Sequence, residues 1–201
     1  HTGVKSQALD LVFEIIEGFE IRPSIFIPTH VNRKNEKLNN QALMLAEKGC
    51  VVDATCHAEV STSDTSWMNA AEFALRARDN GLLEHVSFSS DAGGSMPIWN
   101  QDRSRIIGMG VGSPASLVFE LNLLVNQKGV PLEQALLPLT TTPARIYRLD
   151  HRKGTVDVGK DADLILLDPS SFTIRDVLAA GEWVVQNGVA QKKGYFEHDG
   201  G

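Results

Sequence analysis

The sequence predicts an α/β protein whose parallel sheet is of the kind found in enzyme barrels, followed by a small all-β unit. Two observations predict this fold. Strand-like apolar runs alternate with segments of helical spacing through the first 150 residues, which is the pattern of right-handed βα units. After Gly154 the helical spacing stops and short strand-like runs follow one another. We therefore divide the chain into two domains, residues 1–150 and residues 151–201.

Helices and strands of the first domain alternate in order. Apolar residues with three-and-four spacing predict helices over residues 4–18, 38–46, 67–75 and 117–125, with Gly18, Gly49, Asn80-Gly81 and Gly129 placed to end them. Two shorter helices are expected within residues 131–145, and a loop rich in glycine and serine over residues 108–113. Three strands are predicted at residues 25–30, 50–55 and 86–91.

Polar and apolar side chains alternate along the second and third of these strands. Asp53 and Thr55 share one face of their strand, and Ser87, Ser89 and Asp91 share one face of the next. A doubly wound sheet buries both faces under helices, whereas a barrel tolerates polar residues that face its lumen near the active-site end. The alternation therefore favours a barrel.

The second domain reads as a set of short strands. An apolar strand is predicted at residues 164–167, with further strand-like runs at 174–180, 183–186 and 189–190. Asn187-Gly188 is a strong signal for a hairpin turn between the last two.

Composition and charge exclude several classes of protein. The 201 residues are 42% hydrophobic and 22% charged, typical of a globular chain, and a net charge of −6 leaves no basic surface for a nucleic acid or an anionic membrane. Cys50 and Cys56 would lie roughly 20 Å apart along one extended strand, too far for a disulfide. With no signal peptide and no apolar stretch long enough to span a bilayer, we expect a reduced, cytoplasmic protein.

Two residues at strand ends are candidates for chemistry. His30 ends the first predicted strand and Asp91 ends the third, and active sites of barrels gather at the carboxyl ends of strands. Zinc accepts imidazole nitrogen and carboxylate oxygen at about 2.0–2.2 Å, so the two could share a divalent cation. The alternative is a hydrogen-bonded loop histidine and an aspartate that caps the next helix.

Two further residues could bind a substrate. Arg33, on the loop after His30, has a guanidinium suited to two-point binding of a carboxylate, although a charged loop is more often simply solvated. Ser95 follows a Gly-Gly pair that would let backbone approach a ligand closely, or that merely forms a turn. The remaining histidines have no partner at ligand spacing and are expected at the surface or in supporting positions: His57, His85, His151 and His198.

Three segments carry a resemblance to a known family. Residues 27–33 (Ile-Pro-Thr-His-Val-Asn-Arg), residues 89–95, and residues 154–166 are similar to motifs of the amidohydrolase superfamily and, within it, of the isoaspartyl dipeptidases. His1-Thr2-Gly3, with His1 placed 29 residues before His30, resembles the family's preceding metal histidine.

The resemblance implies a fold, a cofactor and a site. The fold is the second half of a (β/α)8 TIM-like barrel of the metal-dependent hydrolase type, followed by a small β-sandwich segment. The cofactor is zinc, binuclear in an intact enzyme, with a His-x-His pair and a bridging carboxylated lysine that lie outside this chain. His1, His30 and Asp91 would bind metal, Asp91 would move protons, and Arg33 and Ser95 would hold a small peptide substrate.

The implied activity is hydrolysis of β-aspartyl (isoaspartyl) dipeptides by attack of a metal-activated hydroxide. Alternatives are another amidohydrolase acting on cyclic imides or N-acyl amino acids, and a non-catalytic fragment or interaction domain. Because a full barrel takes about 250 residues, we expect this chain to be the carboxy-terminal part of a larger enzyme and inactive by itself. Exposed strand edges would favour a homo-oligomer.

Overall fold

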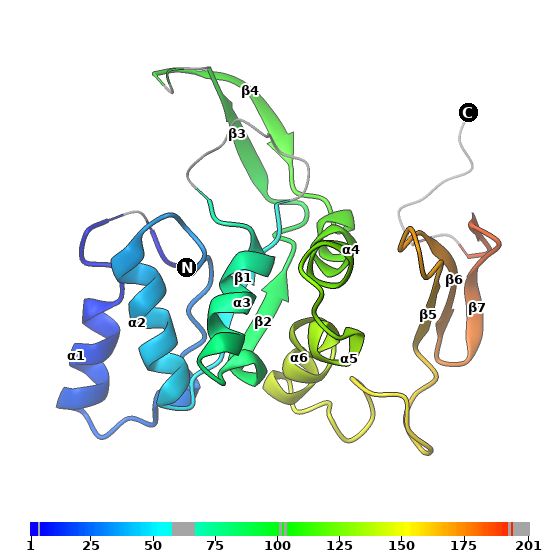
Figure 1. The fold of residues 1–201 in the computed structure, drawn as a ribbon, viewed down its shortest axis with the longest axis horizontal. Coiled ribbons are helices and arrows are strands. Elements are labelled where there is room, and N and C mark those ends of the chain that lie inside the picture. The colour runs from blue at the N-terminus through cyan, green and yellow to red at the C-terminus, as the bar shows by residue number, and fades with distance from the viewer. Residues whose placement is uncertain (4, 58–66, 101, 103, 193, 195–201) are drawn as a thin grey trace.

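A computed structural model describes residues 1–3, 5–57, 67–100, 102, 104–192 and 194. Figure 1 shows helices gathered around a short parallel sheet, a hairpin that projects from it, and a separate antiparallel sheet near the C-terminus. The α/β class predicted from the sequence is confirmed.

The parallel sheet consists of β1 (Val52–Thr55) and β2 (Val86–Ser89), with Asp53 opposite Ser87 and Thr55 opposite Ser89. The helices α2 (Glu36–Glu47) and α3 (Ala70–Asp79) pack against it with fully buried side chains such as Leu38, Leu45 and Phe73. The Asn35 side chain caps α2 by accepting a hydrogen bond from the Leu38 N–H.

The first predicted strand, residues 25–30, is reduced to one bridging residue. Pro23 begins the short 3₁₀ helix η1 (Pro23–Ile25), and Ile25 and Ile27 are 59% and 42% exposed. Only Thr29 pairs with the sheet, in a parallel bridge to Asp53. The prediction of a buried strand is wrong here, but the segment still runs parallel to β1 and brings His30 to its carboxyl end.

The first helix is also shorter than expected. It is α1 (Asp10–Gly18), and Ala8 just before it has φ of 48°, outside the helical region. Hydrogen bonds from Lys37 and Gln41 of α2 to the Asp10 carboxylate hold α1 beside α2.

A hairpin replaces the predicted glycine- and serine-rich loop. Its strands are β3 (Ser95–Trp99) and β4 (Ile106–Val111), which pair antiparallel and project away from the helices (Figure 1). Gly108 and Gly110 lie within β4, and glycine is a poor signal for a strand, which explains why the sequence predicted a loop.

The helices after the hairpin follow the predicted spacing. They are α4 (Ala115–Asn122), the π-helical turn η3 (Leu123–Gln127), α5 (Leu132–Leu136) and α6 (Thr141–Ile146). Two short 3₁₀ turns, η2 (Leu83–His85) and η4 (Leu137–Leu139), complete this part.

The C-terminal sheet matches its prediction closely. β5 (Leu164–Leu167), β6 (Ile174–Ala179), β7 (Glu182–Gln186) and β8 (Val189–Ala190) form one antiparallel sheet in sequential order. Asn187 and Gly188, with φ of 51° and 75°, form the turn between β7 and β8. Phe172 and Leu167 of this unit join the main core. The β-sandwich and the boundary at residue 151 stay predictions.

No helix in the described part of the chain is long and apolar enough to cross a membrane. Cys50 and Cys56, which lie within that part, are buried free thiols.

Candidate functional site

His1 and His30 come together because the first residues run beside the segment that leads to His30. The Thr2 N–H donates a hydrogen bond of 3.0 Å to the Thr29 carbonyl, and the Thr2 hydroxyl donates to the same carbonyl at 2.7 Å. As a result, His1 Nδ1 lies 2.9 Å from His30 Nε2. Two nitrogens bound to one tetrahedral zinc ion at 2.0–2.1 Å each lie about 3.3 Å apart, so this pair is close to the donor spacing of a shared metal.

His30 is oriented by the end of β1. Its other ring nitrogen, Nδ1, lies 2.7 Å from the Thr55 hydroxyl oxygen, and the side chain is buried. Burial lowers the pKa of His30, which favours the neutral imidazole that binds metals. A fixed partner on the second nitrogen is the usual way to orient a ligating histidine.

Asp91 follows β2 in a loop that two glycines allow to pack tightly. A Cβ on Gly112 would lie 2.4 Å from the Asp91 carbonyl oxygen, and one on Gly94 would lie 2.9 Å from it. The Gly93 N–H donates to the Gly112 carbonyl, which ties the loop to the end of β4. The Asp91 charge raises the pKa of His30 against the effect of burial, so the carboxylate lies within electrostatic reach of that histidine. Asp91 caps no helix, because β3 follows it.

Asp53 is a buried carboxylate on the polar face of the sheet. Its two oxygens accept hydrogen bonds from the Ser87 hydroxyl at 2.9 Å and the Ser89 hydroxyl at 2.6 Å. The pKa of Asp53 is raised to about 6, mainly by burial and to a smaller extent by the Asp91 charge, while the hydrogen bonds from Ser89 and Ser87 lower it. The predicted polar face is therefore confirmed, although Asp53 itself was not among the candidate site residues.

Arg33 packs on an aromatic ring rather than standing in a solvated loop. The central carbon of its guanidinium lies 4.2 Å from the centroid of the Trp67 ring. Ser95, the other predicted substrate residue, is exposed at the start of β3, opposite Val111 of β4.

Trp67 is the residue that sequence reasoning misplaced. Its spacing with Ala70 and Ala74 predicted a helical position, but α3 begins at Ala70 and Trp67 instead forms an antiparallel bridge with Arg33. The sequence predicts that His57 lies either at the surface or in a position that supports the site. Its ring centroid lies 4.1 Å from that of Trp67, which corresponds to a supporting position. His85 contacts the Cys50 carbonyl, and His198 lies outside the described residues.

Within the part of the chain that the structure describes, no group of three or more His, Cys, Asp or Glu side chains is arranged to hold a metal ion. The structure thus brings together the histidine pair and places Asp91 within its electrostatic reach. The three-ligand set of His1, His30 and Asp91 stays a prediction.

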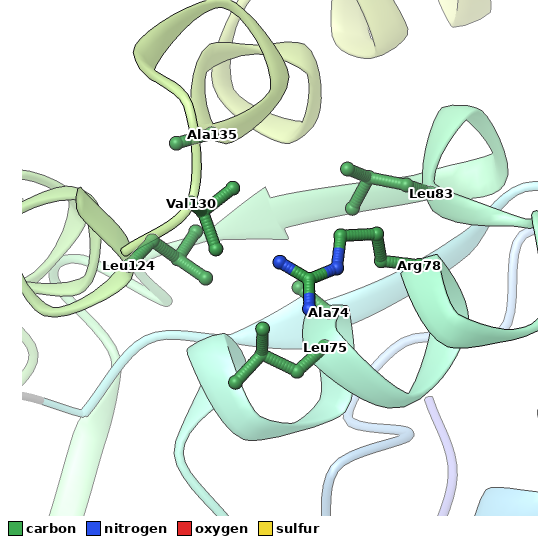
Figure 2. Close-up of a pocket in the computed structure, with 7 residues that line it drawn as sticks. All are labelled: Ala74, Leu75, Arg78, Leu83, Leu124, Val130 and Ala135. Atoms are coloured by element: carbon green, nitrogen blue, oxygen red, sulfur yellow. The ribbon is translucent and has the colours of Figure 1, made fainter. Parts of the chain in front are cut away.

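A shallow apolar depression lies elsewhere, between α3, η2, η3 and α5. Figure 2 shows Arg78 extending along this depression beside Leu75 and Leu124. It has no room for a water molecule and is lined by none of the predicted site residues, so it is a packing gap between helices.

Comparison with known proteins places the chain in a family. The model of the amidohydrolase family matches residues 25–184. The β-aspartyl dipeptidase of Fervidobacterium islandicum AW-1, solved in complex with a β-Asp-Leu dipeptide, is 32% identical, with a TM-score of 0.82 over 97% of this chain. The chain covers 48% of that dipeptidase.

Two curated relatives match shorter parts of the chain. The D-hydantoinase of Rhizobium radiobacter is 34% identical over 104 residues, which is 50% of this chain and 22% of the hydantoinase. The imidazolonepropionase of Picrophilus torridus is 28% identical over 146 residues, 71% of this chain and 29% of that enzyme. Since the family model spans most of the chain, the chain belongs to the amidohydrolase family, a family of hydrolases.

Proposed function

We propose that the protein is a metal-dependent hydrolase that cleaves β-aspartyl dipeptides. The single observation that carries the proposal is its similarity, over 97% of the chain, to a dipeptidase solved with such a dipeptide. Two further observations support it: His1 and His30 form a pair that could bind a metal, and Arg33, three residues beyond His30, could bind a carboxylate of the substrate.

Each residue has a role in this proposal. His1 and His30 bind a divalent metal, zinc by preference for imidazole, and Thr55 orients His30. The metal, when bound, supplies Lewis-acid activation of water and of the amide carbonyl. Asp91 takes a proton from the attacking water and gives it to the leaving amine. Arg33 binds a carboxylate of the substrate and Ser95 donates a hydrogen bond to it. A His-x-His pair and a carboxylated lysine from outside this chain would complete a binuclear centre.

The test uses the full-length enzyme, loaded with zinc and supplied with β-Asp-Leu or α-Asp-Leu. We expect hydrolysis of the β-linked dipeptide alone, loss of activity with a chelator, and recovery with zinc. Asp91→Asn should be inactive, while Asp102→Asn, an exposed residue between β3 and β4, should match the parent. Equal turnover of both dipeptides, or turnover that survives the chelator, would contradict the proposal.

Arg33→Lys tests whether the substrate carries a free carboxylate. Lysine keeps the charge but loses the planar, two-point contact, so kcat/KM should fall by roughly ten- to a thousandfold. Kinetics equal to those of the parent would remove Arg33 from the substrate site.

The similarity to a D-hydantoinase favours one second candidate, hydrolysis of a cyclic imide or amide. Hydantoin and dihydrouracil in the same assay decide between the two. A cyclic substrate without a free carboxylate should be turned over equally well by Arg33→Lys and by the parent.

The proposal also includes a reducing, cytoplasmic location, supported by the two buried thiols Cys50 and Cys56.

A further inference from the structure

The indole of Trp67 contacts three side chains of the candidate site. The Arg33 guanidinium lies over its ring at 4.2 Å, the His57 ring lies 4.1 Å from it, and the His30 ring lies 5.7 Å from it in an edge-on arrangement. These three partners come from two different loops, which follow the Thr29 segment and β1. Trp67 thus links the predicted metal ligand His30 to the predicted substrate residue Arg33.

The backbone around Trp67 is anchored to the loop that carries Arg33. Trp67 and Arg33 form an antiparallel bridge, and the Met68 N–H donates a hydrogen bond of 2.8 Å to the Asn32 carbonyl. The fully buried Asn32 side chain donates to the carbonyls of Met68 and Thr55, and its oxygen accepts from the Thr55 N–H at 2.9 Å. Asn32 therefore ties both loops to the end of β1, and the position of the indole is set by the sheet.

This placement matters because arginine has a long, flexible side chain. A guanidinium that lies on an indole is attracted to the face of the ring, while its N–H donors remain in its own plane and point outward. Stacking and carboxylate binding therefore use different parts of the group. Stacking lowers the number of orientations that Arg33 must lose when it binds a substrate.

We propose that Trp67 is a positioning residue, which holds the Arg33 guanidinium beside His30 in the orientation that binds the substrate carboxylate. The inference rests on the proposed function, in which Arg33 binds that carboxylate. Trp67 is half-buried and is not part of the hydrophobic core, so its replacement should leave the fold intact.

The kinetic test uses the zinc-loaded full-length enzyme and β-Asp-Leu. Trp67→Leu should raise KM by about threefold to thirtyfold, the range of one cation–π contact, with little change in kcat. Trp67→Tyr, which keeps an aromatic face, should recover most of this loss. Trp183→Leu, the same change at a half-exposed tryptophan of β7, should match the parent.

A double-mutant cycle separates positioning from a general structural role. Arg33→Met removes the guanidinium and keeps most of the side-chain length. If Trp67 acts through Arg33, Trp67→Leu should have no further effect on KM in that background. Additive effects of the two changes, or a lower melting temperature that accounts for the loss in Trp67→Leu, would overturn the proposal.

A spectroscopic measurement tests the contact without any activity. The Arg33 Nε–H resonance, assigned by its loss in Arg33→Lys, should be displaced by the ring current of Trp67, return to its ordinary position in Trp67→Leu, and stay displaced in Trp183→Leu. A displaced signal in an enzyme that does not cleave β-Asp-Leu would leave the Trp67–Arg33 contact standing and reject the proposed function. An ordinary signal in the parent enzyme would reject the positioning role whatever the activity.

Discussion

His30 and Asp91 both adopt left-handed backbone conformations, with φ of 66° and 48°. Such conformations are unfavourable for residues with a Cβ and gather at functional sites, where the surrounding structure holds them in place. Here the surrounding structure is visible: Thr55 holds the ring of His30, and two glycines make room for the loop of Asp91.

Gly112 gives a sharp prediction for Asp91. In Gly112→Ala the new Cβ would lie 2.4 Å from the Asp91 carbonyl oxygen, so the loop must move. A displacement of about 1 Å at a catalytic group can lower the rate about a hundredfold. We expect kcat of the full-length enzyme to fall by about tenfold or more.

Gly108→Ala is the matched control for this change. Gly108 lies in the same hairpin, and its new Cβ would meet only the Ile98 side chain, at an ordinary 3.6 Å. It should keep the parent rate. Equal rates for both variants would show that the loop of Asp91 tolerates the displacement.

The raised pKa of Asp53 predicts that the stability of the protein depends on pH. Burial raises the pKa of Asp53 from 3.8 to about 6, so the folded protein binds this proton more tightly than the unfolded chain does. Its contribution to the free energy of unfolding is therefore present at low pH and is lost as the pH rises from about 4 to about 6, by up to about 3 kcal/mol.

Urea denaturation of metal-free protein between pH 4 and pH 8 measures this effect. The stability of Asp53→Asn relative to the parent should increase across that window. Asp10→Asn should show almost no trend in that window, because the Lys37 hydrogen bond lowers the pKa of Asp10 below its ordinary value and its contribution is lost only as the pH falls below about 4. A difference between Asp53→Asn and the parent that does not vary with pH would show that Asp53 does not titrate there.

At the scale of elements, α3 depends on a residue from α4. The Glu120 carboxylate is buried and accepts hydrogen bonds from the Ala70 N–H at 3.3 Å and the Ala71 N–H at 2.9 Å, at the start of α3. These N–H groups have no partner within their own helix, because the first turn of a helix leaves its donors free. Burial raises the pKa of Glu120, while the two backbone donors lower it.

Glu120→Ala should therefore destabilise the protein strongly. It leaves two donors without their acceptor in a buried position, which we expect to lower the free energy of unfolding by about 2–4 kcal/mol. Glu133→Ala, an exposed residue in the first turn of α5, should lower it by less than about 0.5 kcal/mol. Thermal and urea denaturation measure both. Similar small losses would mean that water replaces the carboxylate as acceptor.

At the scale of the whole molecule, the projecting hairpin exposes an apolar stripe. Ile107, Met109 and Val111 alternate along one face of β4 and are 58%, 60% and 67% exposed. Contiguous exposed apolar residues on a strand favour contact with another surface. We propose that copies of the protein associate through this stripe, in line with the homo-oligomer expected from the sequence.

Light scattering after size exclusion, over a range of concentrations, tests the association. Met109→Lys should raise the concentration at which the oligomer dissociates by about tenfold or more, because a lysine must be desolvated in the contact. Ile165→Lys, an equally exposed change on β5, should leave the oligomer as it is. If only Ile165→Lys raised the concentration at which the oligomer dissociates, the contact would lie on the C-terminal sheet instead.

The sequence by itself determined the elements whose signals are local. Apolar spacing located α2, α4 and the strands β1, β2 and β5 to β8, because a helix or strand that buries one face must repeat its apolar residues at the period of that element. The alternation along β1 and β2 identified the polar face where Asp53 meets the two serines. The pairing of His1 with His30 was predicted only through resemblance to a family.

Only the tertiary structure decided the contacts that shape the site. Trp67 meets Arg33 across 34 positions, and Glu120 reaches Ala70 across 50. Gly112 packs under Asp91 across 21 positions, from the end of a hairpin whose glycines hide its strand character. Such contacts leave no periodic trace in a sequence, because each depends on a single pair of residues brought together when distant segments pack. The local pattern therefore predicts where a site lies, and the packing determines which side chains complete it.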